Sequence, residues 1–158
     1  MSASIRVAGP DDVTALSLLR WRWRVDEGGE TGSREEFTAA FGAWVVGHET
    51  SHTAFLAEAD GLAVGMAWLA RTDRVPGPSR FVRTAGNLQS LYVVPERRNR
   101  GIGGLLVTAV LERARSGGMD YVAVHPSALS FPLYRRAGFA EKAAVLELRW
   151  SRPVEQSV

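Results

Sequence analysis

A glycine-rich turn at the start of a helix is the feature of this sequence with the clearest chemical meaning. Three glycines, Gly101, Gly103 and Gly104, stand within four positions ahead of a regular helical pattern. Glycine inside a helix costs about 0.5–1 kcal/mol relative to alanine, so the glycines need a reason. At a helix N-terminus they leave unpaired backbone N–H groups bare, and such a row of donors suits a phosphate or pyrophosphate. A tight strand-to-helix turn without a ligand would explain the same glycines, and the turn alone does not decide between the two.

A buried strand and an amphipathic helix would position this turn. Residues 91–94 are β-branched, aromatic and apolar, and Pro95 cannot continue a sheet ladder. After the turn, apolar residues recur at the spacing of one helix face, at Ile102, Leu105, Leu106, Ala109, Val110 and Ala114. Gly117 and Gly118 then predict the end of the helix.

The remaining segments predict one α/β domain. Asp60-Gly61 between two apolar runs indicates a hairpin, and Ser33 with Glu36 has the capping-box pattern of a helix start. Strands are expected at 5–8, 53–59, 62–70, 87–94, 120–125 and 145–150, and helices at 12–26, 33–47, 102–116 and 127–137. A strand–helix–strand unit implies parallel neighbours and a hairpin antiparallel ones, so the sheet is mixed, with helices on both faces. We expect one domain over 1–150, a turn-rich loop or frayed strand at 71–86, and a loose tail at 151–158.

Composition excludes several classes of function. The 158 residues include no cysteine, which rules out a disulfide framework, a thiolate metal site and a cysteine nucleophile. Nineteen basic residues nearly balance seventeen acidic ones, so bulk charge does not favour a nucleic-acid partner. The N-terminus has no apolar signal core, and no run approaches the ~18 apolar residues of a membrane span. We therefore expect a cytoplasmic protein with no metal and no nucleic-acid or membrane partner.

A second motif follows the glycine turn. A strand ending in His125-Pro126-Ser127 is followed by the sequence PLYRRAGF over 132–139. Together with Arg98-x-x-Gly101-x-Gly103 after a buried strand, this closely resembles the GCN5-related N-acetyltransferase (GNAT) family, whose motifs are Gln/Arg-x-x-Gly-x-Gly/Ala and LY-x-x-x-GF. The resemblance covers nearly the whole chain. It implies an α/β (α+β) acetyltransferase fold with a central mixed, mostly antiparallel sheet of six or seven strands and helices on both faces.

The resemblance implies an acetyl-CoA site built around the glycine turn. The amides of the turn would hold the pyrophosphate, and the pantetheine arm would bond to the central strand like an added strand. The implied cofactor-binding residues are Leu91, Tyr92, Val93, Arg98, Asn99, Arg100, Gly101, Ile102, Gly103, Gly104, Ser127 and Ser130. Ser127 stands where many members carry an asparagine, which weakens the transfer of roles there.

Tyr134 is implied to lie beside the sulfur of the thioester. A phenol with a pKa of about 10 can protonate the departing CoA thiolate. Packing between helix and sheet is the alternative role for this side chain.

The general base is less evident. An amine with a pKa near 10.4 must lose a proton before it attacks, which costs several kcal/mol at neutral pH. Family members often carry a glutamate on the central strand, where this chain has Gln89 and Ser90, neither of which is a base. His125 is the best substitute by chemistry, because histidine titrates near neutral pH. Glu58 and Glu30 are weaker candidates.

The resemblance predicts an acetyl-CoA-dependent N-acetyltransferase for a primary amine of a small molecule or peptide. A CoA-binding sensor with weak or no activity is the alternative, because no base is evident. A nucleotide-binding protein of another fold is disfavoured, since no Gly-Lys-Ser/Thr follows the glycines. A nucleic-acid binder using Arg97, Arg98 and Arg100 is disfavoured by the absence of a basic stripe.

The acceptor amine is not identified by the sequence. Residues 21–41 and 71–86 are expected to build its site, and their mixed charges favour neither cationic nor anionic acceptors. An edge strand over 145–150 could pair with a second copy of the chain, which would make a homodimer.

Overall fold

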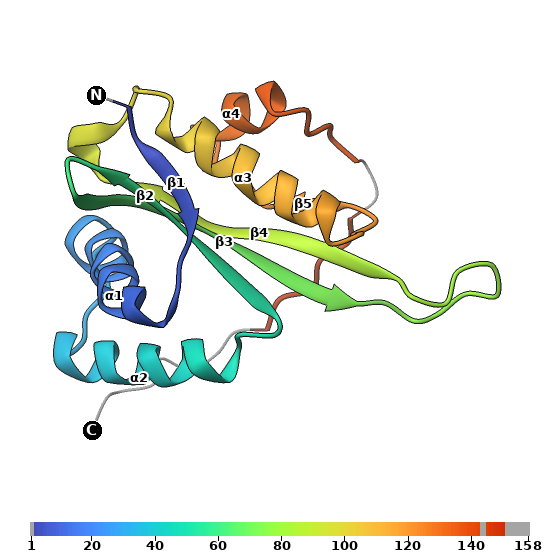
Figure 1. Ribbon diagram of the computed structural model, residues 1–158, viewed down its shortest axis with the longest axis horizontal. Helices are drawn as coiled ribbons and strands as arrows, with labels where there is room; N and C mark the ends of the chain where they lie inside the picture. Colours follow the sequence, from blue (N-terminus) through green and yellow to red (C-terminus); the bar gives the residue numbers. More distant parts are fainter. Residues whose placement is uncertain (1, 143–144, 151–158) are drawn as a thin grey trace.

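A five-stranded sheet forms the centre of the protein. The computed structural model describes residues 2–142 and 145–150. The strands are β1 (Ser4–Val7), β2 (His52–Ala59), β3 (Leu62–Asp73), β4 (Thr84–Val93) and β5 (Val122–Val124). They lie in the order β1-β2-β3-β4-β5 (Figure 1). The pairs from β1 to β4 are antiparallel and β5 is parallel to β4, which confirms the mixed, mostly antiparallel sheet.

Helices cover both faces of this sheet, as predicted. They are α1 (Val13–Trp21), α2 (Arg34–Gly47), α3 (Ile102–Ser116) and α4 (Phe131–Arg136), with a π-helix, η2 (Arg22–Glu27), after α1 and 3-10 turns η1 (Pro10–Asp12) and η3 (Pro95–Arg97). Helices α1 and α2 lie on one face, and α3 and α4 lie on the other (Figure 1). None of the described helices is long and apolar enough to cross a membrane.

The core consists of two apolar layers, one on each face of the sheet. Leu56 on β2 and Met66 on β3 are register partners and therefore share a face. Trp68, two residues along β3, points the same way and meets Phe41 of α2 edge-on at 6.0 Å. On the opposite face α3 packs against the strands, and its side chains Leu106, Val107 and Val110 are fully buried. Most of the expected apolar stripe thus faces the sheet, but Leu105, a member of that stripe, is 46% exposed, and Val107, which lies outside it, is buried.

Two parts of the chain differ from the expected strands. Residues 71–73 and 84–86, expected in a turn-rich loop or frayed strand, are regular and extend β3 and β4 into one long hairpin that projects from the body (Figure 1). Residues 145–150, expected to be the last strand, form no strand, so the described chain has five strands rather than six or seven. The predicted tail at 151–158 lies outside the described residues.

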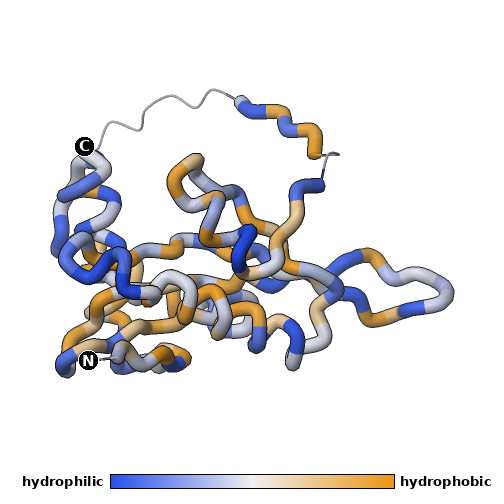
Figure 2. Tube along the Cα trace, turned by 90° about the horizontal axis from the view of Figure 1, so that it is seen from above, coloured by the Kyte–Doolittle hydropathy of each residue, from blue (hydrophilic) through white to orange (hydrophobic). Residues whose placement is uncertain are grey.

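Residues 145–150 alternate between apolar and polar side chains, but none of the apolar side chains is buried. Their apolar side chains Val145, Leu146, Leu148 and Trp150 are exposed by 73–100%. Figure 2 shows the alternating segment apart from the body. An alternating pattern stabilises a strand only through pairing and a covered face. The last strand of the sheet, β5, is only three residues long and offers a short edge for pairing. The pairing of 145–150 with a second copy stays a prediction.

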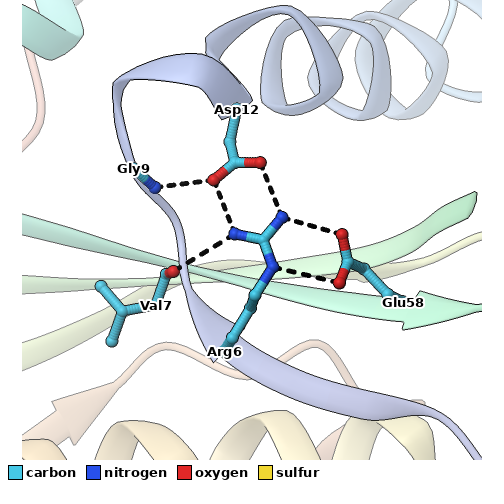
Figure 3. Close-up of polar contacts among 5 residues, drawn as sticks. All are labelled: Arg6, Val7, Gly9, Asp12 and Glu58. Carbon is cyan, nitrogen blue, oxygen red and sulfur yellow. Dashed lines mark hydrogen bonds and ion pairs between the residues drawn. The ribbon is translucent and has the colours of Figure 1, made fainter. Parts of the chain in front are cut away.

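An arginine on β1 ties the first strand to its neighbours in sequence and in the sheet (Figure 3). The Arg6 guanidinium donates two hydrogen bonds of 2.7 Å to Asp12, at the start of α1. It donates two more, of 2.8 and 3.0 Å, to Glu58 on β2. Two bidentate pairs on one guanidinium fix both partners in orientation as well as in distance.

This network predicts how stability changes in acid. The hydrogen bonds from Arg6 and from the Gly9 amide lower the pKa of Asp12 to about 2. A lowered folded-state pKa stabilises the fold above the unfolded value of about 3.9, and the effect is lost as pH falls through the folded value. Replacing Arg6 by glutamine should therefore lower stability at neutral pH and flatten the decline between about pH 4 and 2.

Urea unfolding followed at a series of pH values from 7 to 2 measures this effect. Arg34→Gln is the matched control, because the described chain offers this exposed arginine no ion-pair partner. Equal acid sensitivity in wild type and Arg6→Gln would show that Asp12 is not held by Arg6.

Candidate functional site

The site begins where β4 and β5 part. Only residues 86–88 of β4 pair with β5, opposite 122–124, although β4 continues to Val93. Pro126 follows β5 closely and has no N–H to extend the ladder. The backbone edge of β4 beyond Leu88 is therefore open on this side, and the two diverging strands leave a cleft between them.

A β-bulge reshapes β4 at the same point. Between the paired positions Trp68↔Gln89 and Met66↔Tyr92, β4 contains one residue more than β3. Ser90 lies in the bulge with a left-handed φ of 54°, which is uncommon for a residue other than glycine. Arg20 of α1 donates a hydrogen bond of 2.9 Å to the Ser90 hydroxyl. Bulges redirect side chains, and this one lies directly on the cleft.

The turn after β4 presents free backbone donors at the N-terminus of α3. Gly101 has φ +81° and precedes the first helical residue, and Asn99 is also left-handed at φ 59°. From Asn99 onward, the first amide bonded to a backbone carbonyl is that of Leu105, which donates to Gly101. Within the described chain, the N–H groups of Ile102, Gly103 and Gly104 have no backbone acceptor. The turn has the geometry that binds anions.

Arg98 supports the turn from within. Its Nε donates to the carbonyl of Val93 at 2.9 Å, and its Nη2 donates to Glu27 at 2.8 Å. The guanidinium also lies over the Tyr92 ring, 5.6 Å from the centroid. This arginine therefore links the end of β4 to the glycine turn and to η2.

These features line one cleft with a volume of about 1310 Å³. Most of the residues predicted from the sequence lie along it: Leu91, Tyr92, Val93, Arg98, Asn99, Gly101, Ile102, Gly103, Gly104, His125, Ser127, Ser130 and Tyr134. Arg100 does not lie at its wall, and neither do Glu58 and Glu30, the weaker candidates for the base. The cleft also includes Gln89 and Ser90 of the bulge.

Tyr134 and His125 enter the cleft from different elements. Tyr134 on α4 is buried, packs edge-on against Phe139 at 5.5 Å, and has its pKa raised by burial. The Tyr134 hydroxyl has no hydrogen-bond partner among the described residues. Its oxygen is not among the fully enclosed polar atoms, and the residue lines the cleft, so the hydroxyl is open to the cleft. His125 follows β5 directly and is exposed. A protonated phenol and an imidazole thus share one cavity.

The opposite wall comes from η2, part of the 21–41 segment expected at an acceptor site, although the sequence assigned no role to its individual residues. Trp23 stacks on Tyr92 with a centroid distance of 5.7 Å and an interplanar angle of 14°. Glu27 accepts a hydrogen bond from the Tyr92 hydroxyl and pairs with Arg98. Both lie in the π-helix, a rare form that is frequent at functional sites. The alternating tryptophans and arginines of this segment were the available signal, but they do not reveal that the helix widens.

The environment shifts two ionisable groups of this wall in opposite directions. Burial, and then the hydrogen bond to Glu27, raise the pKa of Tyr92 far above its usual value. Burial tends to raise the pKa of Glu27, but the hydrogen bonds from Tyr92 and Arg98 outweigh it and leave the pKa lower than usual. Glu27 is therefore charged and Tyr92 neutral at physiological pH.

Of the two segments expected to build an acceptor site, one lies at the cleft. Residues 21–41 supply Trp23, Glu27 and Gly28, whereas no residue of the 71–85 part of the second segment lines the described cleft. Their hairpin extends away from it (Figure 1). Within the described residues, no group of three His, Asp or Glu side chains is placed to hold a metal ion.

Comparison with known proteins identifies the family. The model of the acetyltransferase (GNAT) family matches residues 15–139. No curated protein sequence matches the chain significantly. A predicted acetyltransferase from Clostridium acetobutylicum, solved with acetyl-CoA, is 23% identical, with a TM-score of 0.75 over 94% of this chain and 96% of that one.

Two further solved structures share the fold. Glucosamine-6-phosphate N-acetyltransferase from Arabidopsis thaliana is 18% identical, with a TM-score of 0.73 over 96% of this chain and 100% of that one. AAC(6')-Iy, in complex with a bisubstrate analog, is 21% identical, with a TM-score of 0.75 over 96% of this chain and 100% of the other. At these identities the likeness concerns the fold.

The left-handed conformation of Gly101 predicts that replacing it by a larger residue lowers stability, even though there is room for a side chain. No atom lies within 4 Å of a Cβ built at this position, yet Gly101→Ala should lower the free energy of unfolding by about 1–2 kcal/mol, because a Cβ disfavours positive φ. Asparagine tolerates this conformation, so Gly101→Asn should cost less.

Urea unfolding compares these variants with Gly32→Ala, whose site is equally open and has no positive φ. If Gly101→Ala were as harmless as this control, the turn would not depend on its left-handed residue.

Proposed function

Because this chain belongs to the acetyltransferase (GNAT) family, we propose that it transfers the acetyl group of acetyl-CoA to a primary amine of a small molecule or peptide. One observation carries the proposal. The bare amides of α3, the open edge of β4 and the hydroxyl of Tyr134 line a single cleft. Pyrophosphate, amide-bearing arm and thioester follow one another along acetyl-CoA, so each feature faces the part that it can bind.

The amides of residues 102–104 would hold the pyrophosphate. A helix N-terminus contributes up to about 2 kcal/mol to such binding, whereas micromolar affinity requires about 8 kcal/mol. The remainder would come from the pantetheine arm, whose amides can bond to the open edge of β4 between Gln89 and Val93. Ser127 and Ser130, whose hydroxyls lie 3.0 Å apart, offer further donors across the cleft.

In the transfer, a neutral amine attacks the thioester carbonyl carbon, a C–N bond forms and the C–S bond breaks. The departing thiolate requires a proton. Tyr134 can donate it, because burial raises its pKa and keeps the phenol protonated at physiological pH. Its position in the cleft wall supports this role over packing alone.

The proton lost by the amine requires an acceptor. Gln89, on the strand where the family often has a glutamate, cannot take it. Glu27 lines the cleft, but its lowered pKa makes it a weak base, and Tyr92 and Arg98 already occupy its oxygens. We therefore assign proton removal to His125, directly or through water.

Two of the compared structures carry names that fit an amine acceptor. One is a glucosamine-6-phosphate N-acetyltransferase, and the other holds an acetylneamine joined to CoA. The alternative is a CoA-binding sensor. It is supported by Gln89, because this position has no carboxylate that could act as a base. Release of free CoA thiol across a panel of amines separates the two: binding without turnover of any amine would favour the sensor.

Calorimetry with acetyl-CoA tests the cofactor site. Gly103→Val should weaken acetyl-CoA binding at least tenfold, because a branched side chain would cover the free amides of the α3 N-terminus and crowd Leu133, already 3.4 Å from a Cβ built there. Thr108→Val, on the exposed side of the same helix, is the matched control. Unchanged affinity in Gly103→Val would refute the amide cradle, and no binding by the wild type would refute the proposed function.

Tyr134→Phe should lower kcat about 100-fold and leave acetyl-CoA affinity nearly unchanged, because general acid catalysis contributes about 10²–10⁴-fold. Turnover is followed as thiol release and affinity by calorimetry. Tyr121→Phe, which changes a tyrosine outside the cleft, controls for the loss of a hydroxyl. A Tyr134→Phe protein with full activity would leave this side chain with a packing role only.

A further inference from the structure

Within the described chain, each arginine around the η2 wall is paired with a carboxylate, with a single exception. Arg22 pairs with Glu96, Arg24 with Glu30, and Arg98 with Glu27. Each of these arginines therefore has a carboxylate of its own in the protein.

Arg20 is the exception. No carboxylate of the described chain forms an ion pair with it, and its one hydrogen bond to a side chain goes to the neutral hydroxyl of Ser90, at 2.9 Å. The side chain is half-buried, burial and then the like charge of Arg24 lower its pKa, and Glu30 acts on it only from beyond pairing distance. An arginine remains charged under these conditions. Burying part of a cation without a counter-charge costs free energy, and an anion from a ligand would offset that cost.

Arg20 lies beside the cleft: it is not itself among the described residues that line it, but it contacts two that do. Its guanidinium lies 5.1 Å from the centroid of the Trp23 ring, and both Trp23 and Ser90 line the cleft. Held by a stacked indole and a hydrogen bond, the guanidinium keeps further N–H donors for a ligand.

The phosphates of CoA are not the anion that fits here. Ser90 and Val93 are three residues apart on β4, a length of about 10 Å, and the anion-binding turn begins only after Val93. Arg20 instead lies on the side of the bulge walled by η2, where Trp23 and Glu27 face β4. This is the side from which an acceptor would approach.

We propose that Arg20 binds an anionic group, a carboxylate or a phosphate ester, carried by the acceptor amine. The inference rests on the proposed acetyltransferase function and narrows its substrate class to amines that also bear an anion. Arg20 would orient the acceptor through this group while the amine points at the β4 bulge. It acts in binding and specificity and takes no part in proton transfer.

Pairs of acceptors with and without an anion test this proposal, with rates compared per neutral amine because a carboxylate also raises the pKa of a neighbouring amine. One pair is an α-amino acid and its amide, such as L-leucine and L-leucinamide, and the other is glucosamine 6-phosphate and glucosamine. Each is assayed with acetyl-CoA for kcat/KM. In the wild type the anionic member of at least one pair should be favoured about 10- to 100-fold, as for hydrogen bonds to charged groups. The pair that shows the preference tells a carboxylate acceptor from a phosphate one.

Substitution of Arg20 distinguishes binding from support of the fold. In Arg20→Gln the ratio of kcat/KM within the favoured pair should fall toward one, mainly through KM, and Arg20→Lys should retain part of it. Arg24→Gln is the matched control: its guanidinium also lies over Trp23, at 5.8 Å, but it is paired with Glu30, so the ratio should not change. If Arg20→Gln lowered kcat/KM equally for both members of a pair, Arg20 would only support the conformation of the β4 bulge, and the proposal would be overturned.

The wild type alone provides an independent measurement if Arg20→Gln does not fold. Its preference for the anionic acceptor should shrink as ionic strength rises, because salt screens the pair. Acetylation of both neutral amines with no preference for their anionic partners would overturn the inference and leave the proposed function intact. A wild-type protein that does not bind acetyl-CoA would overturn both.

Discussion

The parting of β4 from β5 is the constraint on which the rest of the site depends. The two strands share three pairs of residues, and β4 then continues for five more residues without β5 beside it. An unpaired strand edge inside a protein must find other hydrogen-bond partners, since buried backbone groups are rarely left unsatisfied. The glycine turn continues directly from this edge into α3. Because strand edge and helix N-terminus follow one another, a single extended ligand can satisfy both.

The open edge also joins the two faces of the sheet. Tyr134 enters the cleft from α4, on the face covered by α3, whereas Trp23 and Glu27 enter from η2, on the face covered by α1. Glu27 connects the two regions, because it holds both Tyr92 of the strand and Arg98 of the turn. The η2 wall and the glycine turn are thus coupled through one carboxylate. A change at either end alters the charge balance at the other.

Much of the fold and of the glycine-turn side of the cleft could be predicted from the sequence, because both depend on local chemistry. A proline that ends a strand, glycines that bare a helix N-terminus and an apolar stripe at helical spacing each act over a few residues. The same local reasoning failed at 145–150, whose alternation is typical of a strand. Whether such a segment pairs depends on a neighbouring edge, which no local pattern specifies.

The sequence by itself determined the family motifs, the absence of a carboxylate at Gln89 and the excess of arginine near residues 20–24. Only the tertiary structure decided which of those arginines are paired. Glu96 lies 74 positions from Arg22, Glu27 lies 71 from Arg98, and Ser90 lies 70 from Arg20. Pairing over such separations follows from how η2 and α1 pack against β4. Electrostatic energy depends on distance and burial in space, so the lack of a carboxylate partner for Arg20 becomes visible only in the folded chain.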